Sequence, residues 1–77
     1  MIMTSIYENA KDYLDFSKGI YYFNLCHATQ IKTGKRVFVL SVLKNRELYF
    51  QNYYISLEKA IFKLNEFLMR LDNLESL

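Results

Sequence analysis

The central stretch of the chain, residues 20–55, reads IYYFNLCHATQIKTGKRVFVLSVLKNRELYFQNYYI. It contains three runs rich in β-branched and aromatic residues, which favour strands. These runs are Ile20–Ile31, Arg36–Leu43 and Leu48–Ile55. Polar turn formers separate them at residues 32–35 and 44–47. Because each run is joined to the next by a short turn, the stretch predicts an antiparallel meander with strand order 1-2-3.

Alternation along a strand assigns side chains to two faces of this sheet. On one face we expect Tyr21, Phe23 and Leu25 of the first strand and Phe38, Leu40 and Val42 of the second. The opposite face carries Tyr22, Asn24, Cys26, Ala28, Val37, Val39 and Ser41. This second face is more apolar than a solvated face, which indicates that part of the protein or a partner covers it.

A long helix is predicted from about residue 57 to residue 72, with Ser56 as its N-cap. Its apolar stripe consists of Leu57, Ala60, Ile61, Leu64, Phe67, Leu68 and Leu71. Phe62 and Met69 lie off this stripe by more than a quarter turn, one heptad apart on the charged side. Such a pair predicts a second contact surface and a homodimer, and the alternative is two isolated surface side chains.

The N-terminal segment carries a helix signature. Ser5 and Glu8 have the spacing of a capping box, and Gly19 suits the position just past a helix end. The apolar side chains that a helical period places on one side are Ile6, Tyr7, Ala10, Tyr13, Leu14 and Phe16. We therefore predict a helix over residues 5–17 and the element order α-β-β-β-α. The expected fold is a single α+β domain, residues 1–77, with a three-stranded antiparallel sheet packed against the long C-terminal helix.

Length and cysteine content limit the class of protein. A chain of 77 residues makes one small domain with a thin core. Cys26 is the single cysteine, so an intramolecular disulfide framework is excluded. No segment has the composition of a signal peptide or a membrane span, and we expect a cytoplasmic protein that does not contact membranes.

Charge and aromatic residues are concentrated in the centre of the chain. Residues 18–54 contain six of the ten Lys and Arg residues but one acid, Glu47, together with eight of the thirteen aromatic residues. The segments on either side are mildly acidic. This distribution is the feature of the sequence that points toward a function.

The residue types needed for catalysis or metal binding are too few. Cys26 and His27 are neighbours on a predicted strand and point to opposite faces, so they cannot form a nucleophile and base pair. Glu8, Asp12 and Asp15 share a face of the predicted N-terminal helix, but such a trio is more often solvated than a metal site. We expect no enzyme activity, no cofactor and no metal.

Nucleic acid can be held by aromatic rings that stack on bases and by Lys and Arg side chains that follow the phosphates. The basic candidates cluster at the two predicted turns: Lys32, Lys35, Arg36, Lys44 and Arg46. The tyrosines expected to point outward are Tyr22, Tyr49, Tyr53 and Tyr54. The alternative is that these rings belong to the core and that the cations are merely solvated.

Two resemblances bear on this choice. Gly19–Leu25, Lys35–Leu43 and Tyr53–Leu57, which opens the long helix, resemble the strand and helix pattern of PUR-alpha and PC4-type domains over residues 19–71. Those families bind single-stranded nucleic acid on a curved sheet and dimerise through the terminal helix. The resemblance implies that the binding face includes Tyr22, Lys35, Arg36 and Tyr49. It implies that Phe62 and Met69 lie at the dimer interface. These families have a strand at the position where the residue pattern of this chain predicts the first helix, over residues 5–17.

The α-β-β-β-α order is also similar to that of double-stranded RNA-binding domains, which hold phosphates with a basic cluster at the start of the second helix. Here Glu58 accompanies Lys59 at that position, so this mode of RNA binding is not expected. The leading prediction is a non-catalytic, homodimeric module that binds single-stranded nucleic acid. The alternative is a small phage- or plasmid-type inhibitor or regulator that binds a protein partner through its sheet face.

Overall fold

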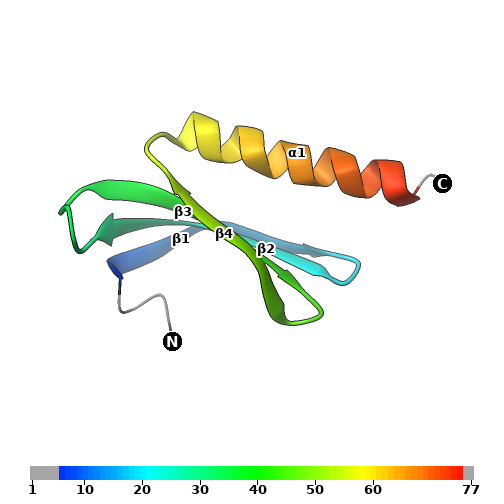
Figure 1. Cartoon of the computed structure of the whole chain (residues 1–77), viewed down its shortest axis with the longest axis horizontal. Coiled ribbons are helices and arrows are strands. Elements are labelled where there is room, and N and C mark those ends of the chain that lie inside the picture. The colour runs from blue at the N-terminus through cyan, green and yellow to red at the C-terminus, as the bar shows by residue number, and fades with distance from the viewer. Residues whose placement is uncertain (1–5, 76–77) are drawn as a thin grey trace.

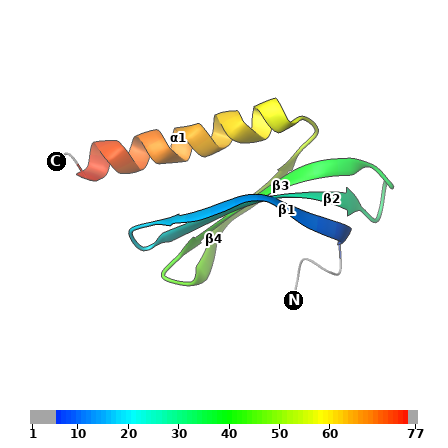
Figure 2. The same ribbon diagram turned by 180° about the vertical axis from the view of Figure 1, so that it is seen from behind.

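The computed structural model describes residues 6–75, with side chains through residue 71. A four-stranded antiparallel sheet in the order β1-β2-β3-β4 is followed by one helix. The elements are β1 (Tyr7–Lys18), β2 (Tyr21–Gln30), β3 (Arg36–Lys44), β4 (Glu47–Tyr54) and α1 (Leu57–Glu75). In both Figure 1 and Figure 2, α1 runs along one side of the sheet. The protein is therefore α+β. Within the described residues 6–75, the one helix, α1, is not long and apolar enough to span a membrane.

The predicted helix over residues 5–17 is wrong. Residues 7–18 instead form β1, which pairs with β2 along its whole length. Ser5, the predicted N-cap, lies outside the described residues. Gly19 does not follow a helix but forms the β1–β2 turn with a φ of 62°. The sheet has four strands in place of three, so the α-β-β-β-α order shared with double-stranded RNA-binding domains is not present.

β-Bulges explain why β1 reads as a helix. Relative to β2, β1 has an extra residue between Glu8 and Lys11 and another between Asp12 and Leu14. Asn9 in the first bulge has a φ of 53°, a left-handed conformation that asparagine tolerates better than most residues. Each extra residue interrupts the two-residue alternation of a strand. The apolar side chains then recur at intervals of three and four, which is the spacing of a helix.

The main core lies between the sheet and α1. Its buried members are Phe23, Leu25, Leu40, Val42, Ala60, Leu64 and Leu71. These residues confirm the face predicted for the first two central strands and the apolar stripe predicted for α1. The N-cap is also confirmed, because the Ser56 hydroxyl accepts a hydrogen bond from the Lys59 amide at 3.2 Å.

A second, smaller cluster lies on the opposite face, called here the open face. Cys26, Ala28, Val37 and Val39 are buried there together with Tyr7 of β1. The sequence predicted that this face would be covered in part. Part of this covering comes from Tyr7 of β1, the strand that replaces the predicted N-terminal helix.

The two ends of the sheet differ in their turns. The β1–β2 turn (residues 18–21) and the β3–β4 turn (residues 44–47) lie together at one end, which we call the paired-turn end (Figure 1). A hydrogen bond of 2.9 Å from the Asn45 amide to the Ile20 carbonyl joins these two turns. The β2–β3 turn (residues 31–35) forms the single-turn end together with Arg36. Ten-residue β2 separates the two ends by about 30 Å.

Candidate nucleic-acid interface at the paired-turn end

The structure divides the five predicted basic site residues between the two ends of the sheet. Lys32, Lys35 and Arg36 lie at the single-turn end, whereas Lys44 and Arg46 lie at the paired-turn end. The five cations therefore do not form one cluster. A compact ligand can therefore contact the cations of only one end.

At the single-turn end, Arg36 is engaged by the protein itself. Its guanidinium donates to the Thr29 hydroxyl at 2.8 Å and to the Asn9 carbonyl at 3.4 Å. A third contact joins Nη2 to Nδ1 of His27 at 3.1 Å, with the arginine as the donor. The His27 ring stacks on Phe38 with centroids 4.5 Å apart. Arg36 thus ties the β1 bulge to β2 and has a structural role.

At the paired-turn end, an aromatic cluster reaches from the core to the surface on the side of α1. Phe67 of α1 packs edge-on against Phe50 and Tyr49, with centroids 4.9 and 6.5 Å away. Tyr49 in turn meets Tyr21 edge-on at 6.0 Å. Phe23, at the base, is 1% exposed, whereas Tyr49 is 58% exposed. The outer rings are therefore held by the core and presented to solvent.

A bulge places Tyr49 in this cluster. Val42 pairs with Phe50 and Leu43 pairs with Leu48, so Tyr49 is an extra residue of β4. Strict alternation would put Tyr49 on the same face as Tyr53. The bulge instead turns its ring toward Phe67 and α1.

The Lys44 side chain lies over two rings of the aromatic cluster. The Lys44 ammonium is 5.8 Å from the Tyr21 centroid and 5.7 Å from the Tyr49 centroid. Such cation–π contacts are worth about 0.5–1 kcal/mol at exposed sites, so they orient the lysine without withdrawing its charge from solvent. An exposed ring and a fixed positive charge therefore stand side by side.

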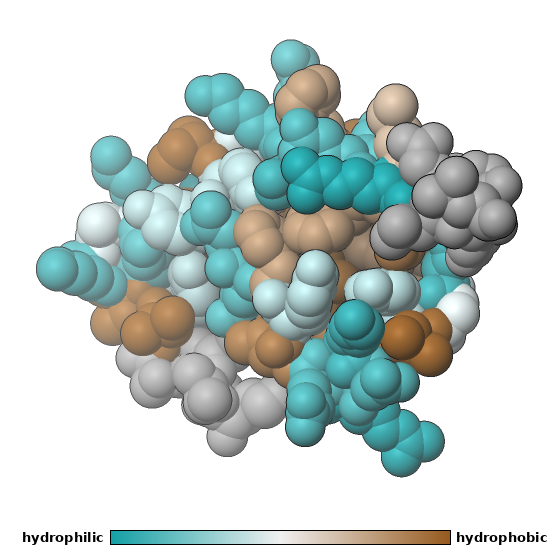
Figure 3. Space-filling model, turned by 45° about the vertical axis from the view of Figure 1, so that its right-hand side comes forward, coloured by the Kyte–Doolittle hydropathy of each residue, from teal (hydrophilic) through white to brown (hydrophobic). Residues whose placement is uncertain are grey.

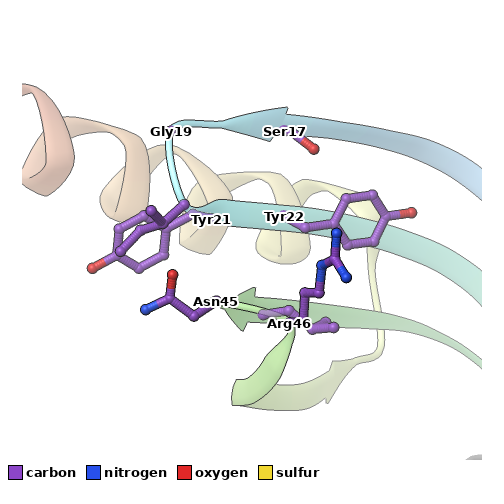
Figure 4. Close-up of a pocket in the computed structure, with 8 residues that line it drawn as sticks. Ser17, Gly19, Tyr21, Tyr22, Asn45 and Arg46 are labelled. Carbon is purple, nitrogen blue, oxygen red and sulfur yellow. The ribbon is translucent and has the colours of Figure 1, made fainter.

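On the other side of the same turns lies a hollow of about 370 Å³. Figure 4 shows Arg46 reaching from the β3–β4 turn toward Tyr22, with Ser17 on the neighbouring strand. The residues that line the hollow are Ser17, Gly19, Ile20, Tyr21, Tyr22, Leu43, Asn45 and Arg46. Within residues 6–75, the Arg46 guanidinium has no hydrogen bond or ion pair, in contrast to Arg36.

The centre of the open face is polar and carries carboxylates. The Tyr22 hydroxyl donates to Asp15 at 2.9 Å, and the Asn24 amide donates to Asp12 at 3.2 Å. The hydrogen bond to Asp15 raises the pKa of the Tyr22 phenol, and burial adds to the effect. Two carboxylates here repel a phosphate backbone, so a strand of nucleic acid is not expected to cross this part of the sheet.

The two remaining candidate tyrosines lie away from the paired-turn end. Tyr53 is 42% exposed on the open face, near the buried Tyr7. Tyr54 does not point outward as predicted, because it packs against the core beneath α1. Neither lies in the hollow or in the aromatic cluster around Tyr49.

Phe62 and Met69 are exposed on the outer side of α1, by 68% and 66%. Their position off the apolar stripe is as predicted, and the dimer that they would form stays a prediction. Figure 3, which brings the paired-turn end forward, shows apolar residues in separate patches among hydrophilic ones.

The residues considered for catalysis do not assemble into a site. Cys26 is buried on the open face, while the neighbouring His27 stacks on Phe38 on the face that carries the main core. Burial raises the pKa of the Cys26 thiol, which disfavours the reactive thiolate. Glu8, Asp12 and Asp15 lie on a bulged strand and not on one helix face. Among the described residues, no cluster of His, Cys, Asp and Glu has the arrangement of a metal site.

Sequence reasoning missed part of the surface at the paired-turn end. Tyr21 was predicted to lie on the same face as Phe23, and it does pack against the main core, but it also joins Tyr49 beneath Lys44. The register of the β2–β3 pair places Tyr21 opposite Lys44, and this register could have been derived from the two turns. The edge-on contact to Tyr49 could not, because it depends on the bulge.

Comparison with protein-family models, curated proteins and solved structures finds no match to the chain.

Proposed function

We propose that the protein is a non-catalytic binding module that holds single-stranded nucleic acid at its paired-turn end. The observation that carries this proposal is the exposed Tyr49 ring, fixed by Phe67 and accompanied by the Lys44 ammonium 5.7 Å away. A base can stack on such a ring, and a phosphate can pair with the lysine. Because every base has an aromatic face, this arrangement does not require a particular sequence.

The element order supports the same proposal. Four strands followed by one helix, with a strand in place of the predicted first helix, is the order that the resemblance to PUR-alpha and PC4-type domains implies. The structure shifts the expected contacts, however. Tyr22, Tyr49, Lys44 and Arg46 are at the proposed site, whereas Lys32, Lys35 and Arg36 are about 30 Å away.

Two tyrosines provide a matched test. Tyr49 and Tyr53 are both substantially exposed, but Tyr49 is at the paired-turn end and Tyr53 is on the open face. We expect Tyr49→Ala to weaken binding of a labelled oligothymidylate about tenfold, since stacking is worth about 1–3 kcal/mol per base. Tyr53→Ala should leave the affinity within about twofold. Fluorescence anisotropy at low and moderate salt measures both, and absence of binding at low salt would refute the proposal.

A protein partner is the second candidate, and the open face favours it. This face carries Tyr53, which is 42% exposed, and tyrosine is among the residues enriched at protein interfaces. A small phage- or plasmid-type inhibitor or regulator would use it to dock on its target. Capture of one stoichiometric protein from host lysate, lost with Tyr53→Ala but kept with Tyr49→Ala, would establish this function in place of the first.

We also propose a homodimer formed through the outer side of α1. Phe62 and Met69, one heptad apart, are the exposed large apolar side chains of this helix through residue 71. Replacing both by serine should convert a dimer to a monomer in light scattering at high concentration. A monomeric parent protein under the same conditions would rule out the dimer.

A further inference from the structure

The hollow at the paired-turn end has the ingredients of a small-ligand site. Its volume of about 370 Å³ is within the range of known ligand pockets. It offers the Tyr22 ring, the Leu43 side chain, the Ser17 hydroxyl and the Arg46 guanidinium. The Tyr22 ring is held in place because its hydroxyl donates to Asp15 at 2.9 Å. An aromatic surface, a hydroxyl and a cation thus face one small volume.

The backbone conformation of Arg46 is one that suits glycine better than arginine. Asn45 and Arg46 have φ angles of 53° and 69°, so both central residues of this two-residue turn are left-handed. Hairpin turns of this kind favour glycine at the second central position, because a Cβ atom is disfavoured there. The chain uses glycine for its other two left-handed turn positions, Gly19 and Gly34.

The side chain of Arg46 does not stabilise the turn in return. Among residues 6–75 its guanidinium makes no hydrogen bond or ion pair, whereas Arg36 makes three such contacts. An unfavourable backbone conformation combined with an unengaged, fork-shaped donor favours a role in ligand binding. Its position at the edge of the hollow identifies where the ligand would lie (Figure 4).

We infer that the hollow binds one nucleotide unit of the single strand, with its base against Tyr22 and Leu43 and its phosphate on the Arg46 fork. The guanidinium can hold two phosphate oxygens at once, which a lysine cannot. Ser17 supplies a hydroxyl group for the edge of the base. This inference rests on the proposed function and adds a second subsite to it, on the opposite side of the turns from Tyr49.

The test uses the full chain and small probes: thymidine monophosphate, thymidine, inorganic phosphate and N-acetylglutamate. In NMR titrations, the monophosphate should shift the Tyr22 and Arg46 resonances and bind at least about tenfold more tightly than thymidine or phosphate alone. Arg46→Lys keeps the charge but not the fork and should weaken this binding about tenfold. Lys35→Ala, at the single-turn end about 30 Å away, should leave mononucleotide binding unchanged.

A second variant separates ligand binding from folding. Arg46→Gly should raise the midpoint of urea unfolding, because glycine suits the left-handed position, and should abolish the shifts caused by the monophosphate. A lowered midpoint would contradict the account of the turn.

The outcomes distinguish this inference from the proposed function. If an oligonucleotide binds through Tyr49 but the monophosphate shifts neither Tyr22 nor Arg46, the hollow is not a nucleotide site and the proposed function stands. If neither ligand binds, both fall. If N-acetylglutamate binds as tightly as the monophosphate, a protein carboxylate is the occupant and the nucleotide assignment is overturned. Equal affinities for the parent protein and Arg46→Lys would overturn the role of the fork.

Discussion

The two ends of the sheet both carry a basic turn with an arginine, yet the two arginines are used differently. Arg36 at the single-turn end donates to Thr29, to His27 and to the backbone of Asn9. Arg46 at the paired-turn end has no such partner in the described residues and occupies a left-handed backbone conformation. One guanidinium holds strands together, while the other is free to meet a ligand.

The number of cations does not distinguish the two ends of the sheet. Both ends present lysines and an arginine to solvent. The difference lies in what accompanies the charge. At the paired-turn end, Lys44 lies over Tyr21 and Tyr49, and Arg46 borders the hollow with Tyr22. At the single-turn end, the aromatic partner is Phe38, whose ring is stacked with His27.

The largest expected effect is on the affinity for oligothymidylate when positive charge is removed from one end of the sheet. The double change Lys44→Ala with Arg46→Ala should lower the affinity for oligothymidylate about a hundredfold at low salt, because two phosphate contacts are lost. The slope of log affinity against log salt should fall in magnitude by about 1.4, because each phosphate contact with a single strand contributes about 0.7. The matched double change Lys32→Ala with Lys35→Ala removes the same charge from the other end. It should change the affinity by less than about threefold, and equal losses in both variants would refute the assignment of one end.

A smaller effect concerns folding stability. Arg36→Ala should lower the free energy of unfolding by about 1 kcal/mol, since exposed hydrogen bonds to Thr29 and Asn9 are lost. Arg46→Ala should change it by less than about 0.5 kcal/mol, as expected for a surface side chain without partners. Urea denaturation measures both. A larger loss in Arg46→Ala than in Arg36→Ala would reverse the roles that we assign to the two arginines.

The smallest expected effect concerns the orientation of Tyr22 at the edge of the hollow. Its hydrogen bond to Asp15 raises the pKa of Tyr22 above the usual 10.0, so the tyrosinate is disfavoured in the folded state. The resulting stability is present below about pH 10 and is lost as the pH rises through the folded-state value. Asp15→Asn should lower the pKa of Tyr22, as followed by its ring resonances. An unchanged pKa would show that Asp15 does not hold this ring.

The central strands could be predicted from the sequence because their signals agree. The runs Ile20–Ile31, Arg36–Leu43 and Leu48–Ile55 differ from β2, β3 and β4 by one residue at most at each end. Short polar turns and strict alternation between two faces specified them. The terminal helix was equally clear, because its apolar stripe and its N-cap lie in one continuous helical pattern.

Bulges account for the main errors. Two extra residues in β1 produced a helix-like spacing, and one in β4 moved Tyr49 to the side of α1. A bulge is specified by pairing with the neighbouring strand, so a pattern within one segment does not reveal it. The distance between the Lys35–Arg36 pair and the Lys44–Arg46 pair, by contrast, could have been derived from the sequence. The predicted meander requires it, since consecutive turns lie at opposite ends of a sheet.

NMR mapping of oligothymidylate on the 77-residue chain at low salt tests directly whether the oligonucleotide binds at the paired-turn end. If the oligonucleotide binds at the paired-turn end, the perturbed backbone amides should belong to residues 17–22 and 43–50. The amides of residues 30–36 and the open-face residues around Asp12 and Tyr53 should change little. Perturbations centred on residues 30–36 or on the open face would contradict the account, because they would place the ligand on the engaged arginine or on the carboxylates.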